Sequence, residues 1–163
     1  MKKLLKILLV AAFLGALGLL PFRSVDAAKL LPVKTVLVTK SGDTYTVDVG
    51  AGVKALGRSL GEALQRLREE VTGVLFLPTA EQVVLTEPAE PAAEAVAREE
   101  AFRPAMGIYR TPDPDPDPEA LGEYLASHPS NTTILDVRAA LAAGELPRIP
   151  RIRSSEGGYL VES

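Results

Sequence analysis

A serine between two glycines is the first feature of this chain that could do chemistry. Residues 57–61, Gly-Arg-Ser-Leu-Gly, match the G-x-S-x-G pattern of serine hydrolases, in which the serine occupies a sharp turn between a strand and a helix. The nearest predicted strand ends at Val49, about eight residues too early for such a turn. Glu62 follows Ser59 at the spacing of a capping box, so we predict that Ser59 caps a helix. A small serine hydrolase using Ser59 is the weaker hypothesis.

A second pattern alternates aspartate with proline. Asp113, Asp115 and Asp117 have the spacing of the first three ligands of an EF-hand loop. That loop needs a glycine at its sixth position and a glutamate at its twelfth, where this chain has Pro118 and Tyr124. We therefore interpret residues 111–118 as a spacer in an extended polyproline II path, spanning on the order of 25 Å, with weak divalent-ion binding as the alternative.

The sequence holds one histidine and no cysteine. His128 lies between Ser127 and Pro129, where we expect an exposed position at a helix end. Zinc sites combine several cysteine and histidine ligands, and disulfides and thiol catalysis need cysteine. We therefore predict a protein that is not an enzyme and has no catalytic residue, no cofactor and no metal site.

The N-terminus has the three-part order of a secretory signal peptide. Three lysines within the first six residues precede an apolar run over residues 7–20, and residues 25–27 (Val-Asp-Ala) suit a signal peptidase. The run of 14 residues is shorter than the roughly 20 of a transmembrane helix, so we expect cleavage after Ala27 or Ala28. The alternative is an uncleaved anchor, with membrane association through residues 4–20. Both place the remaining chain outside the cytoplasm, secreted or anchored to the cell membrane.

The charge beyond residue 27 is acidic. This part carries 14 of the 18 Lys and Arg residues and 20 of the 21 Asp and Glu residues, a net charge of about −6. Nucleic-acid backbones are bound by clustered lysine and arginine, so the sequence predicts no nucleic-acid partner.

The hydrophobic pattern then changes between the periods of strands and helices. Residues 33–39 are apolar on both faces, as in a central strand, and residues 44–49 alternate, so together they predict a hairpin. A helix from Ser59 to Gly73 follows from its capping box and its apolar stripe, which comprises Leu60, Ala63, Leu64, Leu67 and Val71.

Shorter elements follow. We expect two short strands, or one broken strand, at residues 74–77 and 82–86, and another strand at 105–110. We also expect a surface helix with a weak apolar stripe at 91–102, two short helices around 121–125 and 133–144, and an edge strand at 158–162. These elements predict an α+β fold with a mixed β-sheet and packed helices, forming a single domain after the N-terminal segment (1–27). Residues 28–110 would form its core, 111–118 the Pro-Asp spacer and 119–163 a C-terminal helical part of the same domain.

The order of these elements carries a family resemblance. The hairpin is followed by GRSLGEALQRLREEVTGVLFLPTAEQVVLT over residues 57–86, and LDVRAALAAGELPRIPRI follows over residues 135–152. This order resembles the N-terminal domain of the Ger(x)C spore germination proteins, the C subunits of germinant receptors. The matching residues are Gly57, Ser59, Glu62, Ala63, Leu64, Leu67, Leu75, Phe76 and residues 83–85. The family is usually anchored by a lipid on a cysteine, which this sequence lacks.

The resemblance implies a non-enzymatic extracytoplasmic protein of the bacterial envelope that acts in sporulation or spore germination by protein–protein contact. Its partner would be a protein at the membrane or envelope surface. The alternative is a secreted or membrane-anchored binding domain unrelated to sporulation.

Overall fold

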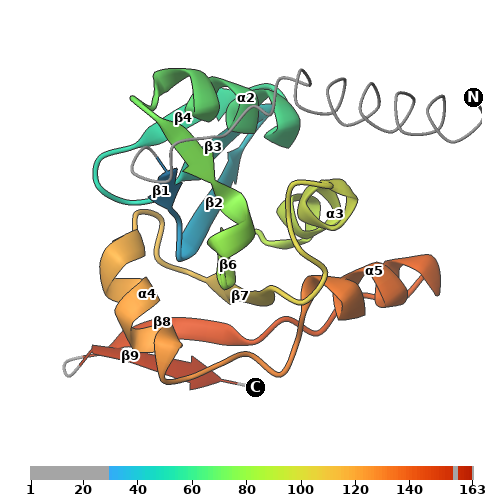
Figure 1. Cartoon of the computed structure of the whole chain (residues 1–163). Coiled ribbons are helices and arrows are strands. Elements are labelled where there is room, and N and C mark those ends of the chain that lie inside the picture. The colour runs from blue at the N-terminus through green and yellow to red at the C-terminus, as the bar shows by residue number, and fades with distance from the viewer. Residues whose placement is uncertain (1–29, 156–157, 163) are drawn as a thin grey trace, which may run out of the picture.

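The computed structural model describes residues 30–155 and 158–162. Its main feature is a seven-stranded mixed sheet (Figure 1). Its strands lie in the order β4 (Lys54–Gly57), β3 (Thr44–Asp48), β2 (Thr35–Ser41), β6 (Gln82–Thr86), β7 (Gly107–Thr111), β8 (Arg151–Ser155) and β9 (Gly158–Glu162). The four strands β2, β6, β7 and β8 pair in parallel, whereas β3, β4 and β9 are added by antiparallel pairing. The predicted hairpin is confirmed, with Val38 opposite Val47.

The central strands are apolar on both faces because helices cover both sides of the sheet. One face packs α2 (Leu60–Glu70), α3 (Glu90–Arg98) and α5 (Ile134–Ala142) against side chains that include Val36 and Val83. The other face packs α4 (Pro118–Ala126) against side chains that include Leu37 and Val84. Figure 1 shows α4 on the opposite side of the sheet from α3 and α5. The chain therefore folds as the predicted single α+β domain.

A second, smaller sheet has two strands. Strand β1 (Leu30–Pro32) pairs in parallel with β5 (Val74–Phe76), and a 3₁₀ turn, η2 (Leu77–Thr79), leads from β5 into β6. The two runs predicted at residues 74–77 and 82–86 are thus two strands in different sheets.

The expectation that the helix near residues 91–102 lies on the surface is wrong. Its residues Ala92, Ala93 and Val96 are fully buried in the main core. Alanines give a weak hydrophobic signal in sequence, but their small side chains let a helix approach its neighbours closely. From α5, Arg138 Nε donates to the carbonyl of Ala97 at 2.6 Å, which satisfies one of the free carbonyls at the end of α3.

The Pro-Asp segment bends instead of following an extended path, which corrects the spacer prediction. Asp113 Oδ1 accepts the amide of Asp115 at 3.2 Å, and Asp117 Oδ1 accepts the amide of Glu119 at 2.9 Å. The second bond caps α4, in which Pro118 holds a first-turn position. Pro116 is buried. The segment is therefore a packed connection that carries the chain from β7 across to α4.

A second hydrophobic cluster joins α4 to the sheet. Leu121 and Leu125 pack with Tyr109 of β7 and Ile152 of β8. The Tyr109 hydroxyl donates a hydrogen bond to the carbonyl of His128, so its polar end is satisfied inside the cluster.

The ionisation of Tyr109 provides a test of this cluster. Burial raises the pKa of Tyr109 to about 12, so the folded protein keeps the phenol proton where an unfolded tyrosine, with a pKa near 10, has lost it. The unfolded state then binds fewer protons, and the free energy of unfolding falls as the pH rises from 10 to 12, by at most about 1.4 kcal/mol per pH unit from this residue. Urea unfolding measured between pH 10 and 12 should show a smaller fall in the free energy of unfolding for Tyr109→Phe than for the parent protein. Equal falls in the two proteins would contradict the burial of the phenol.

Within residues 30–155 and 158–162, none of the helices combines the length and apolar character needed to cross a membrane. The predicted signal segment and its alternative as an anchor fall on residues 1–27, outside the described residues.

Candidate functional site

The G-x-S-x-G residues are part of a helix start. The Ser59 hydroxyl accepts the amide of Glu62 at 3.1 Å and thereby caps α2, as predicted. The reciprocal bond runs one residue earlier than in a standard capping box, because Glu62 Oε2 accepts the amide of Arg58 at 2.8 Å. Ser59 therefore has a structural role as the cap of its own helix.

The other two sequence features also have local structural partners. His128 is exposed just after α4, as expected, and its ring stacks on that of Tyr124 with centroids 4.1 Å apart. Asp113 and Asp117 of the Pro-Asp segment each accept the backbone amide two residues further along the chain. Among the described residues, no three acidic, histidine or cysteine side chains are grouped closely enough to hold a metal ion.

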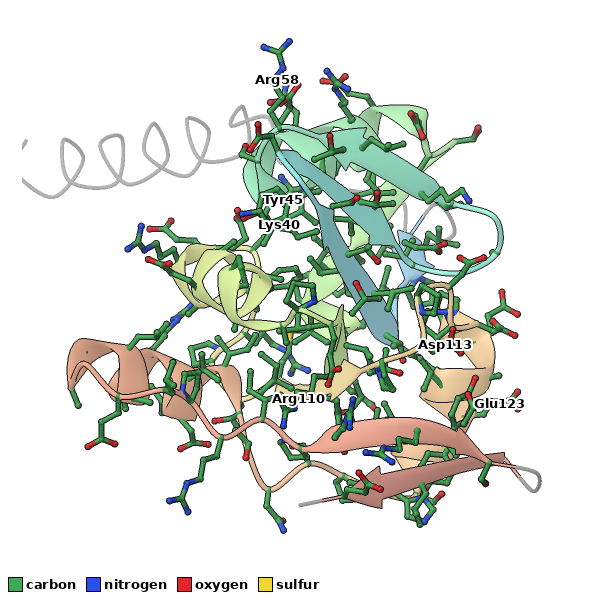
Figure 2. All side chains as sticks on the ribbon, turned by 180° about the vertical axis from the view of Figure 1, so that it is seen from behind. Lys40, Tyr45, Arg58, Arg110, Asp113 and Glu123 are labelled. Carbon is green, nitrogen blue, oxygen red and sulfur yellow. The ribbon has the colours of Figure 1, made fainter. Side chains whose placement is uncertain are left out.

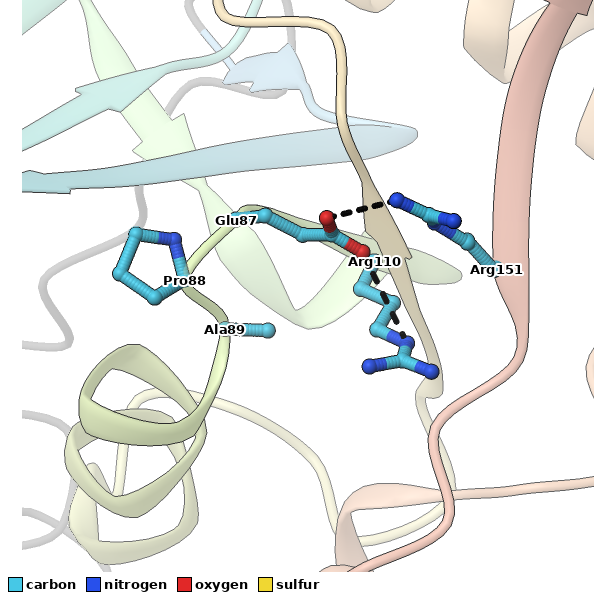
Figure 3. A pocket seen from close by; sticks show the side chains of 5 residues that line it. All are labelled: Glu87, Pro88, Ala89, Arg110 and Arg151. Carbon is cyan, nitrogen blue, oxygen red and sulfur yellow. Dashed lines mark hydrogen bonds and ion pairs between the residues drawn. The ribbon is translucent and has the colours of Figure 1, made fainter.

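A charged cavity lies elsewhere, at the carboxyl ends of β6 and β7. It has a volume of about 520 Å³ and is lined by Glu87, Pro88, Ala89, Arg110 and Arg151. Figure 3 shows Glu87 between the two arginines, with Pro88 and Ala89 leading into α3. We call it the arginine cavity. In Figure 2, Arg110 is well separated from Arg58, so the cavity is distinct from the start of α2.

Three successive parts of the sheet bring these charges together. Glu87 follows the last residue of β6, Arg110 lies near the end of β7, and Arg151 is the first residue of β8, paired with Arg110 in parallel register. Strand alternation places Arg110 on the same face as Ile108, which belongs to the α3 side of the core. The chain leaves β6 toward α3 and leaves β7 toward α4, and such a divergence at the carboxyl ends of parallel strands is a common place for ligands.

The ion pairs within the arginine cavity use only part of the guanidinium donors. Arg151 Nη2 donates to Glu87 Oε2 at 2.8 Å, whereas Arg110 Nε lies 4.0 Å from Glu87 Oε1, beyond hydrogen-bond distance. The Nε atoms of both arginines are shielded from solvent and make no hydrogen bond to any described residue. The three side chains nevertheless remain accessible as a group, with 41% of Arg110, 27% of Arg151 and 29% of Glu87 exposed.

Sequence reasoning identified none of these three residues as a site. Glu87 and Arg110 each stand at the end of a predicted strand, and Arg151 follows Pro150. Charged residues at strand ends are a usable signal only when the strands are known to be parallel and adjacent, because their carboxyl ends then share one edge. The guanidinium donors that Glu87 leaves unused can bind an anion.

Comparisons with protein-family models, with curated proteins and with solved structures found no match.

Proposed function

We propose that this protein is a non-enzymatic extracytoplasmic protein of the spore germination type, which acts by protein–protein contact at the membrane or envelope surface. The signal-type start and the ordered resemblance to the Ger(x)C N-terminal domain support export and the spore setting. The use of Ser59 as a helix cap supports the non-enzymatic part of the proposal.

The contact itself is supported by an exposed face of the sheet, which is the single structural observation that carries this part of the proposal. Strands β8 and β9 extend the sheet beyond β7, and their Tyr159 and Val161 pack toward α4. The opposite side presents the β8–β9 outer face, defined by Arg153, Leu160 and Glu162. Leu160 is 55% exposed at its centre, and Arg153 Nε pairs with Glu162 Oε2 at 3.1 Å beside it. An exposed apolar residue beside a charged pair supports a contact surface at this face.

Genetic complementation tests the proposal. Deletion of the gene in the organism that encodes this chain is expected to slow or impair spore germination, and the full chain should restore it. Leu160→Glu should fail to restore germination, because a carboxylate at the centre of the β8–β9 outer face would disrupt an apolar contact. Leu146→Glu is the matched control, since Leu146 is an exposed leucine on the loop after α5 and should tolerate the change.

A deletion strain that sporulates and germinates like its parent would contradict the spore germination role. In that case, a secreted or anchored binding domain unrelated to sporulation becomes the better hypothesis. If the deletion impairs germination but Leu160→Glu restores it fully, the contact does not use the β8–β9 outer face.

A further inference from the structure

We infer that the arginine cavity is a binding site for one oxyanionic group, a carboxylate or a phosphate, held between the guanidinium groups of Arg110 and Arg151. This inference goes beyond the proposed role in germination and does not depend on it. It rests on the unused donors, the charge and the position of the cavity.

The donors are the first argument. Each guanidinium has five N–H groups, and Glu87 takes one of them from Arg151 at hydrogen-bond distance. Arg110 donates no side-chain hydrogen bond to the described residues, and its Nε is shielded from water, as is that of Arg151. Shielded polar atoms are almost always paired in folded proteins, so two unpaired Nε atoms are unusual. Arg110 and Arg151 both line the arginine cavity, so the N–H donors that they leave unused are available to an acceptor bound there.

The charge is the second argument. Two arginines and one glutamate give the arginine cavity a net charge of +1, in a chain whose overall charge is −3. Glu87 pairs with Arg151 at 2.8 Å but lies 4.0 Å from Arg110, so it does not neutralise both cations. Planar guanidinium groups match carboxylate and phosphate oxygens in bidentate geometry.

The position of the cavity is the third argument. Ala89, which lines the cavity, is the N-cap of α3 and has no side-chain acceptor for the free amides of the first turn. The partial positive charge of a helix start adds to that of the arginines. Arg153, the next residue on the same face of β8, lies outside the arginine cavity and is already paired with Glu162. It therefore provides a matched arginine for control experiments.

Titration of the full chain with simple anions tests the inference. The ¹⁵N-labelled protein in detergent micelles is titrated separately with sodium phosphate and sodium acetate at constant ionic strength, and the arginine Nε–Hε resonances are followed by NMR. Saturable shifts of the Arg110 and Arg151 resonances are expected, with sodium chloride giving none. Saturation by phosphate alone points to a phosphate-bearing ligand, and saturation by acetate, alone or equally, points to a carboxylate.

Variants distinguish this site from general attraction of anions. Arg110→Gln and Arg151→Gln should each weaken binding about tenfold or more, while Arg153→Gln should change it less than about twofold. Glu87→Gln should tighten binding about tenfold, because it removes the competing carboxylate and raises the charge of the cavity. This variant keeps the test decisive if either arginine variant fails to fold.

The inference is overturned if neither anion shifts the two arginine resonances saturably, or if Arg153→Gln weakens binding as much as Arg110→Gln and Arg151→Gln do. Weaker binding by Glu87→Gln would also contradict it, since the glutamate would then belong to the binding machinery and not compete with the ligand. Because no partner protein is present, these outcomes are independent of the complementation experiment.

Discussion

Gly57→Ala is expected to lower the free energy of unfolding by about 2–3 kcal/mol. Gly57 ends β4 two residues before Ser59, the cap of α2, and the helix start lies against it. A Cβ atom at Gly57 would meet the backbone amide nitrogen of Ala63 and come within 2.9 Å of the Ser59 carbonyl oxygen. Both neighbours are backbone atoms of the first helical turn, so the junction between β4 and α2 would have to shift to relieve the contact.

Gly61→Ala is the matched control within the same pattern. Gly61 lies inside α2, and the closest atom to an added Cβ is the flexible Glu99 Oε2 at 3.4 Å. Because alanine favours helix over glycine, this change should raise the free energy of unfolding by about 0.5–1 kcal/mol. Denaturant unfolding of the two variants and the parent measures both effects. If the two variants change the free energy of unfolding by similar amounts, then close backbone packing does not require a glycine at Gly57 more than at Gly61.

Leu121→Ala is expected to lower the free energy of unfolding by about 3 kcal/mol. Leu121 of α4 is fully buried in the second hydrophobic cluster, against the face of the sheet that α4 covers. Truncation would leave a cavity there, because Tyr109 and Ile152 are held in the sheet and cannot close the space.

Leu146→Ala serves as the control for this second change. Leu146 is 81% exposed, and its truncation should cost less than about 0.5 kcal/mol. Chemical denaturation followed by far-UV circular dichroism compares the two. If Leu121→Ala is as mild as the control, then α4 is not an integral part of the core.

The parts of the fold that depend on local sequence were predictable. The start of α2 follows from Ser59 and Glu62, and the start of α5 follows from Thr133 and Asp136, which form a full capping box. In that box, hydrogen bonds from the side chain and the backbone of Thr133 lower the pKa of Asp136. Such signals lie within four residues of each other, so sequence reasoning can use them.

The parts that depend on distant pairing were not predictable. The short apolar runs that became β5 and β6 look alike in sequence, yet one joins β1 and the other the centre of the main sheet. The alanines of α3 give a weak periodic signal although the helix is buried. The turns of the Pro-Asp segment depend on aspartate side chains that bind nearby amides, which a propensity for extended structure does not reveal.

The arginine cavity was missed for the same reason. Glu87, Arg110 and Arg151 are spread over 65 residues of sequence, and only the parallel order β6, β7, β8 places them at one edge. Ser59 and the Pro-Asp segment, which sequence reasoning examined closely, are local patterns with local structural roles.

The most direct test of the proposed function is to determine the N-terminus, cell fraction and time of appearance of the protein in the organism that encodes it, through growth and sporulation. An extracytoplasmic protein that appears in sporulating cells, and that begins at Ala28 or Lys29 if its signal segment is cleaved, is the expected result. A protein found in the cytoplasm, or produced throughout vegetative growth with no change at sporulation, would contradict the proposal.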